Sequence, residues 1–470
     1  MSSADASASA AAPARPAGMP RLVIAAPASG HGKTTIATGL IAAFAARGRR
    51  VAPFKVGPDY IDPGYHALAA GRPGRNLDPF LVGEERVRDL FGHGSAGADL
   101  AIVEGVMGLY DGAAGRGRFA STAHVAQLID APVLLVVDAA AQGRSIAALA
   151  HGFRSFDPRV RLAGVILNRI GSDRHRQILD EALEEIGLPV LGALRRSDAA
   201  AVPARHLGLV PVAERAPEAV AVVRALAELT ASALDLDRIE RIAAGAPALP
   251  VRDWTPQSAM DELAASSPTP RRELVVAVAA GPAFTFSYAE HAELLAAGGA
   301  RVAPFDPLHD EKLPDGTAAL VIGGGFPEVY APALSANEPL REQVRALAER
   351  GGVIAAECAG LLYLASSLDD APMCGVLDVH ARMTDRLTLG YREAVAPHDS
   401  VLCEAGARVS GHEFHRTRVE PGSGAQPAWL WQGARDGFVQ GGVHASYLHT
   451  HWAGQPGVVR RLLEAAACAA

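Results

Sequence analysis

The sequence predicts an α/β fold with two tandem three-layer domains, each built around a parallel sheet. Short apolar runs rich in β-branched residues alternate with helix-like stretches from Arg21 onward, which is typical of parallel strands joined by crossover helices. The alternation stops over residues 243–272, where Pro and Ser accumulate, and then starts again. We therefore expect a disordered tail over residues 1–20, domains over 21–242 and 273–470, and a linker between them.

The composition favours a globular protein that acts on a small molecule. The chain has 470 residues, 49% of them hydrophobic, which is enough for two or three domains with full cores. Its formal charge of −7 gives no basic footprint for nucleic acid or an anionic membrane. The four cysteines form no C-x-x-C pair, which argues against a disulfide framework or a zinc site and fits a reducing cytoplasm. We also expect no secretory signal and no membrane span.

The expected strands are short apolar runs that each end in a loop with small or polar residues. In the first domain they begin at Arg21 and continue at 51–55, 100–104, 132–138 and 161–168. In the second domain they lie at 274–279, 301–305, 318–323 and 352–356, with a helix over 287–297 between the first two. In an open α/β sheet, ligands bind beyond the carboxyl ends of the strands, so residues directly after these runs are the candidates for function.

The first strand is followed by a phosphate-binding loop. The segment reads "RLVIAAPASGHGKTT", with Gly30, Gly32, Lys33, Thr34 and Thr35 at the turn into a helix. Glycines allow backbone N–H groups to approach phosphate oxygens, the lysine reaches the β- and γ-phosphates, and the first threonine is placed to ligate Mg²⁺. A proline replaces the first glycine of the usual motif. The strand-loop-helix setting nevertheless predicts a nucleotide site.

The second strand leads into a segment with clustered carboxylates, "PFKVGPDYIDPGYH". It contains Lys55, Asp59 and Asp62, and lysine is scarce in this chain, occurring otherwise only at Lys33 and Lys312. A compact ammonium and a forked guanidinium are not interchangeable, so a retained lysine points to a specific role. A polar turn built on glycine and proline is the alternative for each aspartate. We expect Lys55 at the nucleotide, Asp59 at the metal and Asp62 at the substrate.

Two later strands also end in polar residues. Glu104 ends the run in "LAIVEGVMGLYDG", the position of a carboxylate that binds or orients Mg²⁺, and Asp111 follows as a substrate residue or a turn former. Asn168 ends the strand in "GVILNRIG". Asn168 and residues 209–211 either frame an adenine or are ordinary strand ends, and the residues alone leave both readings open.

The second domain carries a cysteine in a sharp strand-to-helix turn, "GGVIAAECAGLLYLA". Cys358 takes the place of the nucleophile, and the helix that follows is expected to favour the thiolate. The alternative is a buried small hydrophobic residue. His449 and His451 in "GGVHASYLHTHWAG" offer a base and a group to orient it, with His444 ranked lower. We expect the oxyanion of the reaction to be stabilised by backbone N–H groups from Ala359 and from the loop with Gly324 and Gly325.

With both sites assembled, the chain resembles the cobyrinate or hydrogenobyrinate a,c-diamide synthases of cobalamin biosynthesis. The resemblance rests on the phrases "FKVGPDYIDPGYH", "RNLDPFL", "EGVMGLYDG", "GGGFPEVYAPALSAN", "ECAGLLYL", "LGYREA", "GHEFH" and "ASYLHTHW". It implies a P-loop NTPase-like, dethiobiotin-synthetase-like ATP domain followed by a flavodoxin-like class I glutamine amidotransferase domain. It also implies a ligase that amidates the a and c acetate groups of the ring stepwise, through acyl phosphates, with ATP, Mg²⁺ and glutamine.

By position, the resemblance assigns ATP and Mg²⁺ to Lys33 and Thr34, the metal to Glu104 and the nucleophile to Cys358. It makes His449 the base that activates Cys358, and gives nucleotide, metal and substrate roles to Asp59, Tyr60, Asp62 and Asp111. Glutaminases of this class usually end their triad in His-x-Glu, whereas here the third position is His451.

Several alternatives remain at the level of the sequence. A nickel-tetrapyrrole a,c-diamide synthase would use the same chemistry on another ring, and a partition-type or maturation ATPase switch would need the first domain alone. Alanine-rich, arginine-biased composition favours hydrogenobyrinate over cobyrinate as the corrinoid substrate. The ring is expected to border residues of the second domain, or these are only its satisfied polar residues: Tyr391, Arg392, His412, Glu413 and His415. The oligomeric state stays open, a homodimer included.

Overall fold

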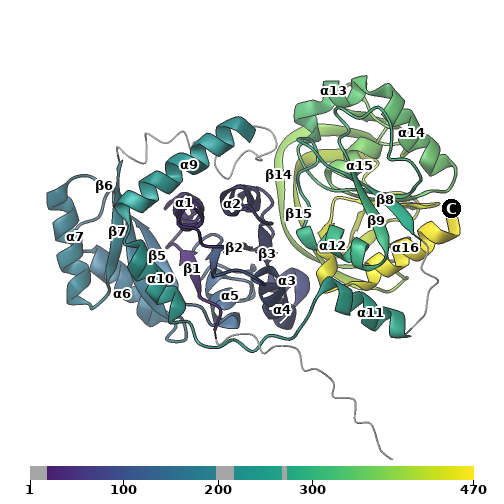
Figure 1. Ribbon diagram of the computed structural model, residues 1–470. Coiled ribbons are helices and arrows are strands. Elements are labelled where there is room, and N and C mark those ends of the chain that lie inside the picture. The colour runs from purple at the N-terminus through teal and green to yellow at the C-terminus, as the bar shows by residue number, and fades with distance from the viewer. Residues whose placement is uncertain (1–17, 197–215, 267–272, 470) are drawn as a thin grey trace, which may run out of the picture.

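The computed structural model describes residues 18–196, 216–266 and 273–469, which form two lobes side by side (Figure 1). Most of the expected N-terminal tail and the expected adenine-framing residues 209–211 lie outside the described residues. None of the helices in the described part of the chain is both long and apolar enough to cross a bilayer.

The first lobe is built on a parallel sheet whose strand order is β3-β2-β4-β1-β5-β6-β7. The strands are β1 (Arg21–Ala25), β2 (Val51–Val56), β3 (Arg75–Leu77), β4 (Leu100–Glu104), β5 (Val133–Asp138), β6 (Leu162–Ile170) and β7 (Val190–Arg195). β1 lies between β4 and β5 in the middle of the sheet. The loop after β1 therefore emerges at the centre of the carboxyl edge, where open α/β sheets bind ligands.

Helices cover both faces of this sheet because its central strands are apolar on both sides. Leu22 and Ile24 of β1 pack against α1 (Lys33–Ala46), α2 (Asp62–Ala70), α9 (Ala216–Ala233) and α10 (Leu236–Ala244) on one face. Val23 points to the other face, which is covered by α3 (Pro79–Val82), α4 (Glu84–Gly94), α5 (Thr122–Leu128), α6 (Ile146–Phe156) and α7 (Asp173–Glu185). The predicted three layers are confirmed.

The second lobe has its own sheet, with strand order β18-β19-β11-β10-β8-β9. The strands are β8 (Leu274–Ala279), β9 (Ala300–Phe305), β10 (Thr317–Ile322), β11 (Val353–Glu357), β18 (Phe438–Gln440) and β19 (Val443–Ser446), all parallel except for the β18–β19 hairpin. α12 (Ala289–Ala297) and α16 (Gly457–Ala469) lie on one face, and α13 (Ala331–Ala336), α14 (Glu338–Glu349) and α15 (Ala359–Leu364) on the other. This is the second predicted α/β domain.

A further, mostly antiparallel sheet was not expected from the sequence. Its long hairpin of β14 (His380–Val395) and β15 (Arg408–Glu420) curves between the two lobes (Figure 1). The remaining strands of this sheet are β12 (Ser367–Leu368), β13 (Ala371–Pro372), β16 (Trp429–Trp431), β17 (Ala434–Asp436) and β20 (His449–Thr450). β20 pairs with β15 and so attaches the sheet to the end of the chain that carries the predicted catalytic histidine.

The segment expected to be a linker, residues 243–272, contains helix α11 (Pro256–Ser266), which packs on α12 and α16 of the second lobe (Figure 1). The hydroxyl of Thr255 accepts a hydrogen bond from Ser258 N at 3.0 Å, and the hydroxyl of Ser258 accepts one from Thr255 N at 2.9 Å. This reciprocal cap starts the helix in a stretch whose weak periodicity had indicated only a linker.

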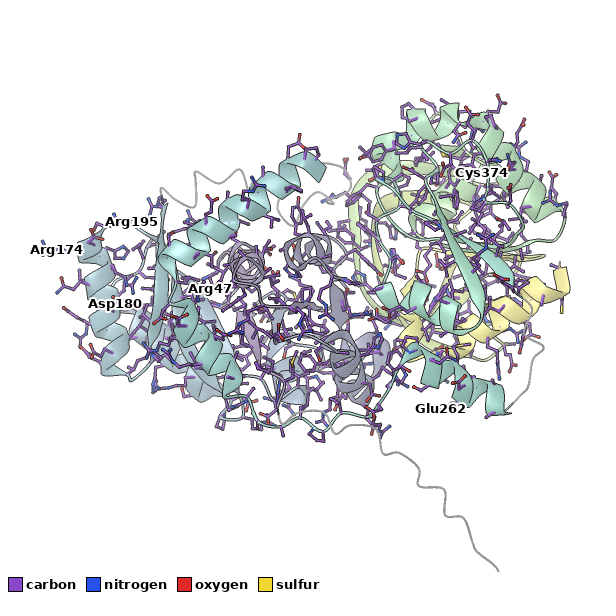
Figure 2. All side chains as sticks on the ribbon, in the orientation of Figure 1. Arg47, Arg174, Asp180, Arg195, Glu262 and Cys374 are labelled. Atoms are coloured by element: carbon purple, nitrogen blue, oxygen red, sulfur yellow. The ribbon has the colours of Figure 1, made fainter. Side chains whose placement is uncertain are left out.

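Buried ion pairs join the two lobes. The guanidinium of Arg75 on β3 donates to Glu290 at 2.6 Å and to Glu293 on α12, and Glu293 also contacts His93 at 2.9 Å. Tyr391 on β14 donates its hydroxyl hydrogen bond to Asp78 at 2.8 Å. By contrast, Figure 2 shows charged side chains of α7 and β7, such as Arg174 and Arg195, at the edge of the first lobe farthest from the second.

The Arg75 ion pairs give a prediction about stability. Arg75→Met should lower the free energy of unfolding by about 3 kcal/mol, because the fully buried carboxylate of Glu290 loses its nearest cation. Denaturant titration followed by tryptophan fluorescence measures the change. The control is Arg382→Met, which breaks an exposed pair with Glu420 and should cost less than about 1 kcal/mol. Equal effects of the two substitutions would contradict the idea that the buried pairs hold the lobes together.

Candidate active sites

The phosphate loop is held open by glycine and braced by an asparagine. Gly30 and Gly32 adopt φ angles of 85° and 93°, which side chains with a Cβ rarely adopt. A Cβ on Gly32 would lie 2.3 Å from Nδ2 of Asn168, which itself donates to the carbonyl of His31 at 2.9 Å. The structure therefore brings the end of β6 against the loop after β1, as expected for two strand ends at one sheet edge.

Lys33 lies in the first turn of α1 and is almost fully buried. Its ammonium donates to the carbonyls of Met107 at 2.5 Å and Ala28 at 3.3 Å. Burial, with a smaller repulsion from Lys55, lowers the pKa of Lys33 to about 8. Thr35, in the same turn, is half-buried. Anionic phosphates beside Lys33 would favour its charged form.

Asp111 contacts the same region from the loop after β4. Its carboxylate accepts a hydrogen bond from Gly108 N at 2.9 Å, and its charge acts on Lys33. The turn-forming role considered for Asp111 is therefore present, and its charge has a small raising effect on the pKa of Lys33.

The predicted metal residues meet Lys55 and one predicted substrate residue, Asp62, in one cluster. The ammonium of Lys55 lies 2.5 Å from Asp62 Oδ2 and 2.8 Å from Glu104 Oε1, with Asp59 Oδ2 farther out at 3.7 Å. The hydroxyl of Thr34 donates to Glu104 Oε1 at 2.6 Å and lies 3.3 Å from Asp62 Oδ2. Residues from the ends of β2 and β4 and the starts of α1 and α2 thus converge.

Charge is unevenly shared within this cluster. Burial alone would raise the pKa of Glu104, but Lys55 and His66 together hold it below its usual value. Asp62 has its pKa raised well above the usual range by burial and by the nearby Glu104. Burial would lower the pKa of Lys55, yet the three carboxylates outweigh it and raise the pKa. The lysine stays charged and keeps Glu104 ionised.

Sequence reasoning missed one member of the cluster. His66 is fully buried, and its Nε2 lies 2.8 Å from Glu104 Oε2. It follows Asp62 by four residues on α2, and residues at that spacing share a helix face. Helical spacing from the predicted aspartate is the signal that would have found it.

The cluster suits a metal ion that arrives with a nucleotide. Among the described residues, no three Asp, Glu, His or Cys side chains converge so as to hold a metal by themselves. Asp62 Oδ1 is buried without a hydrogen-bond partner, and the hydroxyl of Thr34 lies near Asp62 Oδ2 and Glu104 Oε1. Mg²⁺ prefers such oxygen ligands and is usually bound by one or two carboxylates together with phosphate and water.

Cys358 occupies the sharp turn that the sequence predicts between β11 and α15. Its φ angle is 49°, and its backbone N donates to the carbonyl of Ser446 at 2.8 Å. A Cβ on Gly360 would lie 2.3 Å from the carbonyl oxygen of Ile322, so only glycine fits there. The thiol is 3% exposed, and burial raises its pKa. Burial thus outweighs the expected lowering of the thiol pKa, to which a hydrogen bond from the backbone of Ala359 contributes.

His449 is the buried base candidate. It lies on β20 opposite His412 of β15, and burial lowers its pKa to about 3. Its Nδ1 is 3.9 Å from Glu357 Oε2. The other oxygen of Glu357 accepts hydrogen bonds from Thr450 N at 3.1 Å and from the Thr450 hydroxyl at 2.7 Å. Burial raises the pKa of Glu357 to about 7.

His451 has a different set of contacts from His449. Its ring stacks on Tyr288 with centroids 4.1 Å apart, and its Nε2 lies 3.7 Å from Glu290 Oε2. β20 ends at Thr450, His451 is still extended, and a 3-10 turn begins at Trp452. The carboxylate that the structure places beside His449 is therefore that of Glu357, directly before the nucleophile. His444 lies elsewhere, at 3.0 Å from the hydroxyl of Ser400.

The candidate oxyanion-hole residues differ in whether their backbone N–H groups are already hydrogen-bonded within the protein. Gly324 N donates to the carbonyl of Phe286 at 3.1 Å, so this N–H is already used. Gly325 is tightly packed, because a Cβ there would lie 2.2 Å from the carbonyl oxygen of Ala283. Ala359 opens α15, where backbone N–H groups lack helical acceptors. Gly325 and Ala359 remain the candidates.

Tyr60 and the predicted ring-binding residues lie between the lobes. Tyr60 contacts aromatic side chains of the second lobe although it belongs to the carboxylate segment of the first. Tyr391 stacks on Phe80 with centroids 4.2 Å apart. The other predicted ring-binding residues interact within the second lobe, where Arg392 pairs with Glu413 at 2.6 Å, His415 stacks on Tyr447 at 3.8 Å and His412 is buried.

Comparison with known families agrees with this two-site arrangement. Residues 22–210 match the CobQ/CobB/MinD/ParA nucleotide binding domain, and residues 275–457 match the CobB/CobQ-like glutamine amidotransferase domain. The chain thus combines a nucleotide-binding domain with a glutamine amidotransferase domain, each located where the sheets and candidate sites were found.

Relatives of this protein align with it over nearly the whole length of both chains. A Streptomyces coelicolor protein named hydrogenobyrinate a,c-diamide synthase is 59% identical, over 95% of this chain and 97% of that protein. One of the same name from Mycobacterium tuberculosis H37Rv is 55% identical, over 95% and 98%. A Gloeobacter violaceus protein named cobyrinate a,c-diamide synthase is 46% identical, over 94% and 96%. The chain is a glutamine-dependent amidating ligase and belongs to the hydrogenobyrinate/cobyrinate a,c-diamide synthase family.

Proposed function

We propose that the protein amidates the a and c acetate carboxylates of hydrogenobyrinate, using ATP and glutamine, in cobalamin biosynthesis. The observation that carries the choice of ring is the gradient of identity among the relatives. Those named for hydrogenobyrinate are 54–59% identical, whereas those named for cobyrinate are 40–46% identical, at similar coverage. The same gradient supports a metal-free ring over a cobalt-containing ring as the substrate.

The first-lobe site suits activation of a carboxylate. A carboxylate is a poor electrophile, and transfer of the γ-phosphoryl group of ATP would convert it to an acyl phosphate with a good leaving group. Lys33 and the backbone N–H groups of the glycine loop would bind the phosphates. Thr34, Glu104 and Asp62 would hold a Mg²⁺ ion, which supplies further positive charge beside the transferring group. Asp59, 3.7 Å from the ammonium of Lys55, and Asp111, in the loop after β4, would position the acceptor.

The second-lobe site suits release of ammonia from glutamine. The sulfur of Cys358 would attack the side-chain amide carbon while His449 accepts the thiol proton and then gives it to the departing ammonia. The N–H groups of Gly325 and Ala359 would stabilise the tetrahedral oxyanion. Water would then hydrolyse the thioester to glutamate and restore the thiol. We assign the orienting acid of His449 to Glu357, in place of His451.

The direct test supplies the purified protein with hydrogenobyrinate, ATP and glutamine and follows the products by mass spectrometry. We expect a monoamide and then a diamide, with one glutamate and one ADP for each amide formed. Parallel reactions with cobyrinate and with nickel sirohydrochlorin compare the rings. Faster turnover of either metallated ring would overturn the substrate assignment, and ATP hydrolysis without amide formation would indicate an ATPase switch.

The division of labour between the sites predicts the behaviour of the nucleophile. Cys358→Ser should abolish amidation from glutamine and leave amidation from ammonium salts close to that of the unaltered protein, because only the glutaminase chemistry uses the thiol. Amide formation with each nitrogen source is the measurement. Cys468→Ser, at an exposed cysteine on α16, is the matched control and should change neither rate. Equal loss from both nitrogen sources would refute the two-site model.

The assignment of the phosphate site predicts a loss of ATP turnover that does not depend on the nitrogen source. Lys33→Ala should lower ATP turnover by about 100-fold or more with either nitrogen source, because the transferring phosphoryl group loses a buried cation. ADP formation in the presence of hydrogenobyrinate measures the effect. The control is Lys312→Ala at an exposed lysine of the second lobe. Unchanged ADP formation in Lys33→Ala would remove the nucleotide-site assignment.

The assignment of Glu357 predicts a pH dependence. Its pKa is raised to about 7, so the carboxylate that attracts the Nδ1–H of His449 is present above that pH and is lost below it. Glutaminase kcat should therefore rise through pH 7. Glu357→Gln should lower kcat by about 10-fold or more and remove this rise, as expected when a base loses its orienting acid.

The comparison variant is His451→Asn. It should keep the rise in kcat near pH 7, because His451 contacts Tyr288 and Glu290 instead of His449. If His451→Asn removes the rise and Glu357→Gln retains it, the assignment is reversed.

A further inference from the structure

Residues 59–62 form a short segment whose side chains reach both active sites. On the first-lobe side, Asp59 Oδ1 accepts hydrogen bonds from Ile61 N at 2.8 Å and Asp62 N at 3.1 Å. The carbonyl of Asp59 accepts one from Asn76 Nδ2 at 2.7 Å, and Asp62 is held by Lys55. The backbone of the segment is therefore fixed by the same contacts that build the carboxylate cluster.

The intervening side chain, Tyr60, points into the other lobe. Its ring stacks on Phe286 with centroids 5.0 Å apart and planes 12° apart. The ring centroids of Tyr288 and His449 lie 4.9 and 5.1 Å from it. Tyr60 is thus a first-lobe residue in direct contact with the base of the glutaminase site.

The second lobe encloses the rest of the His449 ring. Phe286 and Gly324 exchange backbone hydrogen bonds of 3.0 and 3.1 Å, which fix the loop that carries Phe286. A Cβ on Gly324 would lie 2.3 Å from Cε1 of His449, so the glycine backbone packs directly on the imidazole. His449 is fully buried. One wall of its pocket is Gly324, and another is the Tyr60–Phe286 stack.

This arrangement ties the position of the base to the state of the phosphate site. A shift of Asp59 or Asp62 when ATP and the acceptor bind would move Tyr60, because the residues are adjacent in a tightly hydrogen-bonded turn. Movement of Tyr60 changes the packing of His449, and base catalysis depends on ring placement within fractions of an ångström.

We propose that Tyr60 is a positioning residue that completes the glutaminase pocket from the first lobe and couples glutamine hydrolysis to occupancy of the ATP and acceptor site. The proposal rests on the proposed function, since it assumes that the two lobes carry the two half-reactions. It gives Tyr60 a role at the glutaminase in place of the expected role at the substrate. It also means that the second lobe by itself lacks part of its active-site wall.

The test compares Tyr60→Leu with Tyr60→Phe in the full-length protein. Glutamate release is measured with and without ATP and hydrogenobyrinate, and so is the number of glutamates released per amide formed. Tyr60→Phe keeps the stacked ring and should retain at least half of the stimulation by ATP and acceptor. In Tyr60→Leu, the stimulation should be at least ten-fold smaller than in the unaltered protein, and more than one glutamate should be released per amide formed. If Tyr60→Leu releases the same number of glutamates per amide as the unaltered protein, the proposal is overturned.

Two further variants separate positioning from general damage to the fold. Phe286→Leu removes the other half of the stack and should reduce the stimulation to the same extent as Tyr60→Leu. It keeps the proposal testable if Tyr60→Leu fails to fold, as judged by thermal unfolding. Phe153→Leu alters a comparable stacked pair, with Tyr110, on α6 of the first lobe and should leave the ratio unchanged. A loss of stimulation in Phe153→Leu equal to that in Phe286→Leu also overturns the proposal.

The outcome is distinguishable from failure of the proposed function. If the unaltered protein forms no amide from ammonium, ATP and hydrogenobyrinate, the proposed function fails whatever Tyr60 does. If it forms the amide and Tyr60→Leu keeps full stimulation and one glutamate per amide, only the coupling role fails.

Discussion

The buried ammonium of Lys55 organises the first active site and, through it, the boundary between the lobes. It is 4% exposed and lies among Asp59, Asp62 and Glu104, so three carboxylates share one cation. Removing a single partner from such a buried ionic group commonly costs about 3–5 kcal/mol, because the remaining charge has lost its compensation. The compact ammonium of a lysine can interact with three carboxylates that converge on one point. The planar, forked guanidinium of an arginine does not fit that arrangement. The retention of lysine here, in a chain that otherwise uses arginine, follows from that geometry.

Much of the fold and of the first site was readable from the sequence. Apolar runs ending in Lys55, Glu104 and Asn168 predicted parallel strands, and the rule that strand ends meet at one edge predicted that these side chains would converge. His66 was missed because its only signal is its helical spacing from Asp62, which becomes informative once that aspartate is placed at the site. The hairpin of β14 and β15 was missed because many of its residues are polar and exposed on both faces, so it lacks the alternation of a half-buried strand.

The second site shows where sequence neighbours mislead. His449 and His451 stand two positions apart, a spacing typical of one face of a strand, yet His449 lies near Glu357 whereas His451 contacts Tyr288 and Glu290. Glu357 was overlooked because its place before Cys358 marks it as part of the turn. Its approach to His449 depends on β11 pairing with β19, about ninety residues later in the chain, and on β20 pairing with β15, about forty residues earlier. Such long-range contacts have no local signal.

Burial also sets the resting charge of the glutaminase pair. It raises the pKa of the Cys358 thiol and lowers that of His449 to about 3, so both groups are neutral near pH 7. Catalysis must then begin with proton transfer from sulfur to imidazole, which creates an ion pair in a pocket that disfavours charge. In the proposed mechanism, the oxyanion-hole donors and the carboxylate of Glu357 would offset that cost only when the imidazole is correctly placed. In the proposed role, Tyr60, which lies between two aspartates of the other site, would act at the step most sensitive to geometry.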